Sequence, residues 1–231
     1  MFSLNTTSVM PLATMKQRGK WITQQMDQTF SFPTDVEYQG GGVLPSEMSA
    51  FAAMCVCAGV TVVIESGRRK GYSTECLGKM PVSAFSIEIS PRSDEDDRIA
   101  KKCHVSLLNG NAISMLPALV AKHPNERIAL LLDGPKGPKA LELFDRVKSK
   151  IVFAAFHDIS KKIEHPGELV DNPSRPIFEK RDAWFTDEPE YLTAWAHLDK
   201  HAWSHFDKYK SRADMTYAGF TLAFLQGDKF R

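Results

Sequence analysis

An excess of charge of one sign is missing from this chain. Its 231 residues include 29 Lys and Arg against 28 Asp and Glu, which leaves a formal net charge of +1. Strongly basic proteins bind nucleic acids and anionic membranes, so we expect neither as a partner and favour a small molecule. Hydrophobic residues make up 43% and charged residues 25% of the chain. This is an ordinary globular composition, and the length suits one domain with a sizeable core.

A membrane-spanning run and a cysteine framework are also missing. The apolar stretch at residues 51–64 is shorter than the roughly 20 apolar residues that cross a bilayer. Residues 1–20 are polar and contain Pro11, unlike a signal peptide. The four cysteines have neither zinc-ligand spacing nor the pattern of a disulfide-rich secreted domain. We therefore expect a cytoplasmic protein with reduced cysteines, and a homo-oligomer is compatible with this sequence.

Short β-branched runs alternate with helical patterns from residue 60 onward, which is typical of βαβ units and a mainly parallel sheet. The pattern predicts strands at residues 60–64, 84–87, 105–108, 128–132 and 151–156. It predicts helices at residues 45–58, 72–79, 94–101, 113–122 and 139–149. Further along, we expect a loop at 166–176, a helix at 191–210 and a strand within 215–226. We interpret the chain as one domain: an N-terminal extension (1–45), a ligand-binding core (46–160) and substrate-side elements (161–231).

Two glycines, Gly67 and Gly71, follow the first predicted strand. Glycine lets a backbone turn tightly and approach a ligand without a Cβ in the way. A ligand site is expected at such a strand-to-helix turn. Arg69 stands where the dinucleotide-binding fingerprint has its second glycine, which argues against a bound pyrophosphate. The alternative is a turn that serves chain geometry alone.

Polar residues also follow the second and third predicted strands. Glu88 lies close to the spacing, about 20 residues beyond the glycine turn, at which an acid binds a ribose diol. Asn111 follows Gly110 and can pair with the edge of a base through its donor and acceptor. Each has an ordinary alternative, Glu88 as a solvated loop acid and Asn111 as part of a generic turn.

Three further polar residues follow the fourth and fifth predicted strands: Asp133, His157 and Asp158. Neighbouring parallel strands end at the same edge of a sheet, so we expect these side chains to converge beside the glycine turn. Such a group can deprotonate an acceptor hydroxyl, or the two carboxylates can hold a hard divalent ion. Alternatively, Asp133 caps the following turn and His157 fills a structural hydrogen bond.

Together these motifs resemble the class I S-adenosylmethionine (SAM)-dependent methyltransferases, over approximately residues 42–160 and the final strand. The resemblance implies a doubly wound α/β fold with a mainly parallel seven-stranded sheet and helices on both faces. It also implies SAM as the cofactor. The cofactor contacts that it implies lie at the ends of the first four strands: Glu65, Ser66, Gly67, Gly71, Tyr72, Ser73, Thr74, Glu88, Asn111, Ala112 and Asp133.

The motif style is most similar to that of the small O-methyltransferases. This implies methyl transfer to a hydroxyl of a small molecule beside Asp133, His157 and Asp158, and we expect His157 to be the general base. In metal-dependent members of the family, acids at these strand ends bind a divalent cation such as Mg²⁺, here Asp133 and Asp158. Ile159 stands where the catechol-type enzymes have an amide ligand, so the ligand set departs from theirs.

Two other function classes stay open at this point. One is an NAD(P)-dependent oxidoreductase, against which stand the missing middle glycine and the absence of a Tyr-x-x-x-Lys pair. The other is a non-catalytic protein that binds an adenosine ligand. His197, His201 and His205 recur at four-residue spacing, which suits metal binding or aromatic packing on a helix. The basic run 68–70 suits a solvated loop or a contact with an anionic substrate group.

Overall fold

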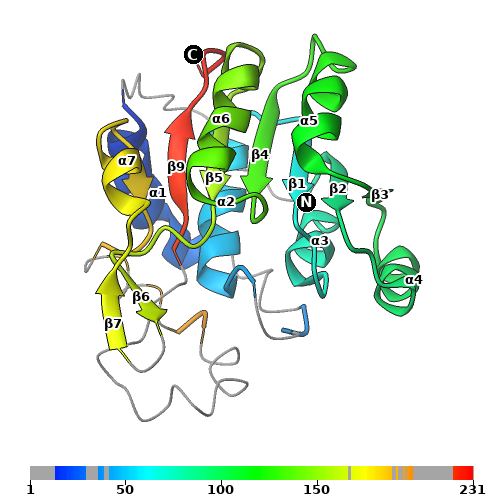
Figure 1. Ribbon diagram of the computed structural model, residues 1–231, viewed down its shortest axis with the longest axis horizontal. Coiled ribbons are helices and arrows are strands. Elements are labelled where there is room, and N and C mark those ends of the chain that lie inside the picture. The colour runs from blue at the N-terminus through cyan, green and yellow to red at the C-terminus, as the bar shows by residue number, and fades with distance from the viewer. Residues whose placement is uncertain are drawn as a thin grey trace.

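A seven-stranded sheet forms the centre of the computed structural model (Figure 1). Its order is β3-β2-β1-β4-β5-β9-β8. The strands are β1 (Val62–Ser66), β2 (Ser83–Glu88), β3 (Ser106–Asn109), β4 (Ile128–Leu132), β5 (Phe153–Phe156), β8 (Trp184–Phe185) and β9 (Ala223–Gln226). The structure describes residues 14–29, 36–38, 42–165, 168–188, 191, 195, 197–199 and 221–230.

The first five strands pair in parallel, and β9 is antiparallel to both of its neighbours. Because β1 lies between β2 and β4, Glu65 is in register with Ser86 on one side and Leu131 on the other. The carboxyl ends of β1 to β5 therefore meet at one edge of the sheet. The expected mainly parallel seven-stranded α/β fold is confirmed.

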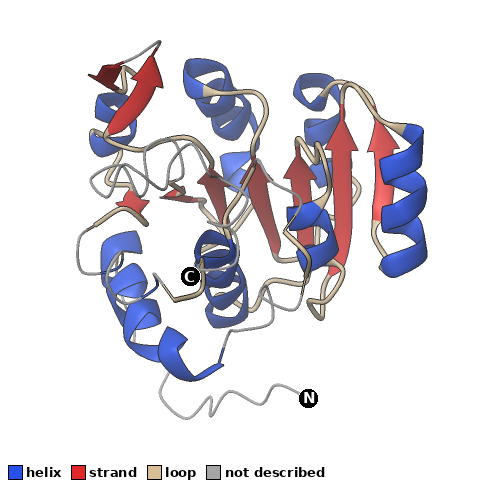
Figure 2. Cartoon of the chain, turned by 90° about the horizontal axis from the view of Figure 1, so that it is seen from below, coloured by secondary structure: helices blue, strands red, loops and turns tan. Residues whose placement is uncertain are grey.

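Helices cover both faces of this sheet (Figure 2). One buried apolar cluster joins it to α1 (Met15–Thr29), α2 (Pro45–Cys57) and α3 (Tyr72–Leu77). The other joins it to α5 (Ala112–Ala121), α6 (Gly137–Val147) and α7 (Arg175–Glu179). α4 (Ser93–Lys102) follows β2, and the short 3-10 helix η2 (Lys148–Lys150) follows α6. Strands covered on both faces are almost entirely apolar, which is why β4 and β5 were predictable from sequence.

The main departures from prediction lie outside this central region. The loop expected at 166–176 is partly wrong, because β7 (Glu168–Asp171) pairs antiparallel with β6 (Lys162–His165) and α7 begins at Arg175. Each strand of this small hairpin has only one or two apolar residues with charged residues on either side, so the strand signal in the sequence was weak. Helix α1 and strand β8 were not predicted. The helix expected at 191–210 falls largely outside the described residues. Of the strand expected within 215–226, residues 215–220 lie outside the described residues, and β9 confirms a strand at its end.

In the part of the chain that the structure describes, no helix is both long enough and apolar enough to cross a bilayer.

Candidate functional site

The turn between β1 and α3 is hydrogen-bonded to the end of β4. The carbonyl of Ser66 accepts hydrogen bonds from the backbone nitrogens of Asp133 (2.8 Å) and Gly134 (3.1 Å), and the Ser66 hydroxyl donates to the carbonyl of Gly134. Gly67 has φ +91°, and a Cβ there would lie 3.1 Å from the backbone of these same two residues. The turn therefore requires glycine, both for its dihedral angle and for this close approach.

Glu65 lies beneath the turn and is fully buried. Its Oε2 accepts hydrogen bonds from the hydroxyls of Thr74 and Ser86, each at 2.5 Å, and its Oε1 accepts one from Ser73. Burial raises the pKa of Glu65, whereas the three hydroxyls favour its ionised form. Glu65, Ser73 and Thr74 were expected to contact the cofactor. In the structure the two hydroxyls bind the Glu65 carboxylate and so connect the start of α3 to the end of β1. Tyr72 is also buried.

Arg68 is a site residue that sequence reasoning missed. Its guanidinium is fully buried rather than solvated, and it forms a bidentate pair with Asp96 of α4, at 2.8 and 2.6 Å. It also donates to the carbonyls of Ser86 and Leu108 and to Oδ1 of Asn109. All five N–H donors of the guanidinium are matched by these five acceptors. Arg68 therefore connects the glycine turn to the ends of β2 and β3.

As expected, Glu88 lies at the end of β2, and Asn111 lies just after the end of β3. Oε2 of Glu88 accepts a hydrogen bond from the backbone nitrogen of Arg69 (2.9 Å), and Oε1 accepts one from Ser90 (3.0 Å). Each carboxylate oxygen has a further acceptor position, so a diol can still bind there. Oδ1 of Asn111 caps α5 through the backbone nitrogen of Ile113 (2.9 Å). Ala112 is the buried first residue of that helix.

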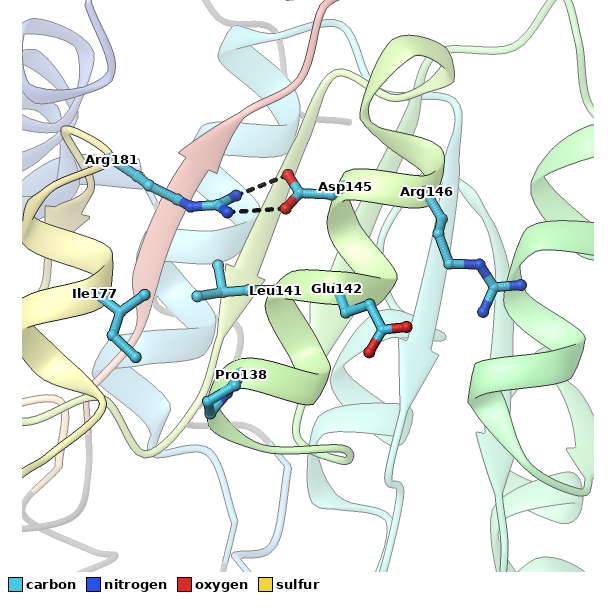
Figure 3. Close-up of a pocket in the computed structure, with 7 residues that line it drawn as sticks. All are labelled: Pro138, Leu141, Glu142, Asp145, Arg146, Ile177 and Arg181. Atoms are coloured by element: carbon cyan, nitrogen blue, oxygen red, sulfur yellow. Dashed lines mark hydrogen bonds and ion pairs between the residues drawn. The ribbon is translucent and has the colours of Figure 1, made fainter.

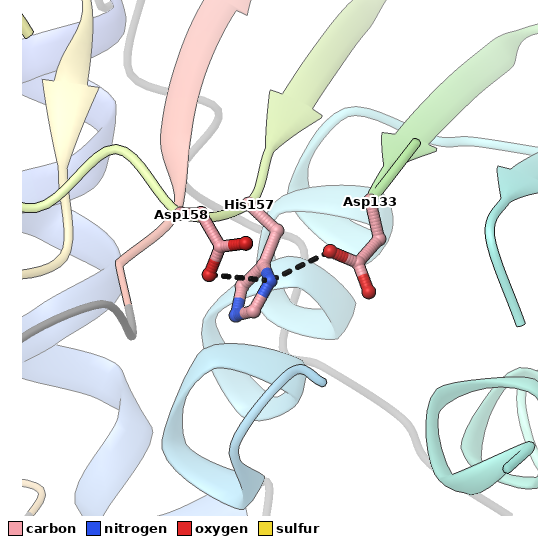
Figure 4. A group of neighbouring side chains, drawn as sticks. All are labelled: Asp133, His157 and Asp158. Atoms are coloured by element: carbon pink, nitrogen blue, oxygen red, sulfur yellow. Dashed lines mark hydrogen bonds and ion pairs between the residues drawn. The ribbon is translucent and has the colours of Figure 1, made fainter. Parts of the chain in front are cut away.

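The ends of β4 and β5 bring Asp133, His157 and Asp158 together, as predicted (Figure 4). Nδ1 of His157 lies 2.8 Å from Oδ1 of Asp133 and 3.2 Å from Oδ1 of Asp158. Nζ of Lys136 contacts both carboxylates, Asp158 at 2.6 Å. His157 is 3% exposed, whereas the Asp158 side chain is 44% exposed. The four side chains form a network of alternating charge that solvent reaches at Asp158 and Lys136.

Glu47 completes this network and was not predicted as a site residue. It belongs to the first turn of α2, and its Oε2 lies 3.5 Å from Nε2 of His157. The same oxygen accepts a hydrogen bond from the backbone nitrogen of Leu44 (2.7 Å). The only sequence signal was a helix-start pattern, in which an acid three residues inside the helix binds back to its beginning. Three carboxylates from three elements therefore surround one imidazole.

The charges of this network fix its protonation near neutral pH. Burial alone would lower the pKa of His157, but the three surrounding carboxylates raise it to about 10. Burial would raise the pKa of Asp133, but the charges of His157 and Lys136 hold it at about 2. Burial would lower the pKa of Lys136, but Asp133 and Asp158 raise it. His157 therefore carries two ring protons at neutral pH, which argues against its expected role as the general base.

A metal ion would meet competition at this group. Ligand atoms of Asp133, His157 and Asp158 lie within 4.8 Å of one another, a spacing that can accommodate a cation. The ammonium of Lys136 already contacts both carboxylates, so an ion bound by the two acids would have to displace it. Ile159 is buried and offers no ligand atom.

Neither the late histidines nor the described pockets add to this site. His197 is exposed, and His201 and His205 lie outside the described residues. A pocket of about 460 Å³ lies between α6 and α7 (Figure 3), and the exposed Asp145–Arg181 pair crosses it at 2.7 and 2.8 Å. None of the expected cofactor, catalytic or metal residues lines this pocket.

Comparisons with known proteins found likeness only among solved structures. No model of a protein family matches the chain. No curated protein matches it either. The TDP-rhamnose 3'-O-methyltransferase CalS11 of calicheamicin biosynthesis is 11% identical, with a TM-score of 0.44, over 90% of this chain and 93% of its own. An O-methyltransferase from Bacillus cereus, solved with SAH, is 12% identical, with a TM-score of 0.43, over 89% and 91%.

The 23S rRNA methyltransferase ErmE is 19% identical, with a TM-score of 0.38, over 50% of this chain and 47% of its own length. This chain therefore spans about half of ErmE. At these identities and TM-scores the likenesses assign neither an activity nor a substrate to this chain.

Proposed function

We propose that this chain is a SAM-dependent methyltransferase that methylates a hydroxyl of a small molecule. One observation carries the proposal: the glycine turn and the charged network share a backbone junction. Ser66 before Gly67 binds the backbone of Asp133, and the side chain of Asp133 binds His157. A cofactor on the turn would therefore lie directly beside ionised groups that can act on an acceptor.

The residues at the strand ends fit the parts of SAM. Gly67 lets the turn approach the end of β4 closely, Glu88 has acceptor positions left for a ribose diol, and Asn111 lies at the next turn toward the sheet edge. Oδ1 of Asp133 takes the contacts with His157 and Lys136, which leaves Oδ2 to accept from the ammonium of the methionine part. Glu65, Ser73 and Thr74 act from beneath, by holding the turn in shape.

The chain's own residues supply orientation, charge and a proton acceptor. Bound SAM supplies a methyl group that its sulfonium has already activated. Lys136 and protonated His157 stabilise negative charge on the acceptor oxygen and so lower the pKa of its hydroxyl. Asp158, the more exposed carboxylate, accepts the hydroxyl proton. With SAM bound, attack of the acceptor oxygen on the methyl carbon would break the sulfur–carbon bond, and alignment of the two reactants would supply much of the rate.

The sequence resembles a family in which some members use a divalent cation. In this proposal the ammonium of Lys136 replaces the positive charge of that cation. Its ammonium touches both acids that would otherwise hold the ion. A fixed positive charge beside the acceptor oxygen stabilises the developing anion whether it is a metal or an ammonium.

The proposal is tested by incubating the purified chain with SAM and a panel of phenols, catechols and sugars while the formation of S-adenosylhomocysteine is measured. We expect turnover with at least one hydroxyl compound and none when that hydroxyl is blocked. NADH in place of SAM tests the oxidoreductase alternative. Binding of NADH without binding of SAM would contradict the proposal.

A further inference from the structure

A buried carboxylate from the far end of the chain caps helix α2. Oδ1 of Asp199 accepts a hydrogen bond from the backbone nitrogen of Ser46 (2.8 Å), and Oδ2 accepts one from the Ser46 hydroxyl (2.7 Å). The two residues are 153 positions apart, and Asp199 is 0% exposed. Leu44, the residue before the helix, has no polar side chain that can accept these first-turn donors. Asp199 therefore acts as the cap from a distant segment.

The same turn of α2 carries Glu47 to the charged network. Glu47 follows Ser46 directly, is 2% exposed, and places Oε2 3.5 Å from Nε2 of His157. Of these two neighbouring residues at the start of α2, Ser46 is thus bound by Asp199, and Glu47 lies against His157. A shift of the helix start would change the distance between Glu47 and His157.

We propose that Asp199 is a positioning residue of the methyl-transfer site: by binding Ser46 it fixes the start of α2, and with it the approach of Glu47 to His157. This inference rests on the proposed function for its effect on activity, but the link between Asp199 and His157 exists without it. Asp199 acts on His157 through Ser46 and Glu47: it binds Ser46 directly, and Glu47 follows Ser46 in the chain.

The surroundings of Asp199 make this link sensitive to pH. Among the described residues, the titratable groups that face Asp199 are Glu47 of α2 and Tyr72 of α3. Burial raises the pKa of Asp199 to about 7, against the hydrogen bonds from Ser46 that favour its ionised form, and the charge of Glu47 adds to the rise. Because an ionised carboxylate accepts stronger hydrogen bonds than a neutral one, Asp199 holds Ser46 most firmly above about pH 7.

The first arm of the test measures kcat for S-adenosylhomocysteine formation and the Kd for SAM. We expect Asp199→Asn and Ser46→Ala each to lower kcat about tenfold and to leave the Kd within about twofold, since small displacements in a site carry large rate costs. If both act through Glu47, adding Asp199→Asn to Glu47→Gln lowers kcat no further. Fully additive losses, or an unchanged kcat in both single variants, would overturn the inference.

A pH series separates positioning from a general loss of structure. We expect the wild-type kcat to rise through about pH 7 in a step that Asp199→Asn lacks, because the amide cannot ionise. The matched control is Asp145→Asn, which removes an acid from the exposed pair with Arg181. It should keep both the wild-type kcat and the pH step. Retention of the step in Asp199→Asn would count against Asp199 as its source.

A second arm needs neither cofactor nor turnover. The ring nitrogens of His157 are observed by NMR in ¹⁵N-histidine-labelled protein at fixed pH and assigned by their loss in His157→Gln. Asp199→Asn and Ser46→Ala should shift these resonances, and Asp145→Asn should not. Unmoved resonances overturn the inference even when wild-type protein transfers methyl groups. Shifted resonances in protein that binds no SAM would overturn the proposed function instead. If Asp199→Asn fails to fold, the test rests on the His157 resonances of Ser46→Ala, which keeps the buried carboxylate.

Discussion

Nδ1 of His157 lies 2.8 Å from Oδ1 of Asp133, which joins the ends of β5 and β4 through one charged contact. Both residues are largely enclosed, so the attraction between them is weakly screened. Because of this contact, the free energy of unfolding should depend on pH.

Stability should fall as pH rises toward about 10. The pKa of His157 is raised to about 10 in the folded chain, whereas an unfolded histidine loses its proton near 6.5. The stabilisation is therefore fully present below about pH 6.5 and is lost as pH rises through about 10. Urea unfolding across this range measures it. The decline should be smaller in His157→Gln, while a variant of the exposed His104, His104→Gln, should decline like the wild type. Equal declines in all three would contradict the assignment.

Gly67→Ala should weaken both the fold and SAM binding. The residue has φ +91°, and the added Cβ would lie 3.1 Å from backbone atoms of Asp133 and Gly134. We expect a loss of about 1–3 kcal/mol in the free energy of unfolding and a SAM affinity reduced at least about tenfold. Calorimetric titration and urea unfolding measure the two effects.

Gly59→Ala is the control for Gly67→Ala, because Gly59 also has positive φ but its Cβ would meet only the Arg127 side chain, at 3.6 Å. It should lose stability through strain alone and keep SAM affinity. Equal affinities in the two variants would remove Gly67 from the cofactor site.

Arg68→Met should cost about 3 kcal/mol or more of stability, since breaking a buried ion pair leaves a carboxylate without its partner. Arg181→Met is the matched comparison. Arg181 also makes a bidentate contact, with Asp145, but both side chains are more than a third exposed, so its loss should cost about 1 kcal/mol or less. Urea unfolding of both variants makes the test. Similar costs would show that Arg68 is not the buried connection described above.

Methyl transfer should persist in the presence of a chelator. The ammonium of Lys136 contacts Asp133 and Asp158 and supplies the positive charge that a cation would bring. Turnover is measured with and without EDTA, and then with added Mg²⁺. We expect a change of less than about twofold in wild-type protein, whereas Lys136→Met should lose at least about tenfold, as when one electrostatic stabiliser is removed. Loss of wild-type activity with EDTA and recovery with Mg²⁺ would contradict this.

Much of the frame was predictable because it depends on local patterns. The fully apolar run at β4 was predicted with its observed bounds, and the parallel order followed from alternating strands and helices. The meeting of Asp133 with His157 followed in turn, since neighbouring parallel strands end at one edge. The glycine turn was predictable from Gly67 and Gly71, whose positive φ angles the structure confirms.

The sequence could not reveal contacts between side chains that are far apart in the chain and meet only in the folded protein. Arg68 looked like part of a solvated basic loop because Asp96 and Asn109 are 28 and 41 residues away. Glu47 looked only like a helix cap, because nothing local places it beside His157. The protonation of His157 likewise depends on burial and on carboxylates from three elements, which no spacing reveals.

Calorimetric titration of SAM tests most directly whether SAM binds across the ends of β1 and β2. The wild-type chain should bind one equivalent. Glu88→Ala should bind SAM at least about tenfold more weakly, having lost a charge-assisted hydrogen bond to the ribose. Glu142→Ala, which removes an exposed acid from α6, should bind SAM as the wild type does. Absence of any binding heat and of any thermal shift with saturating SAM would contradict the account.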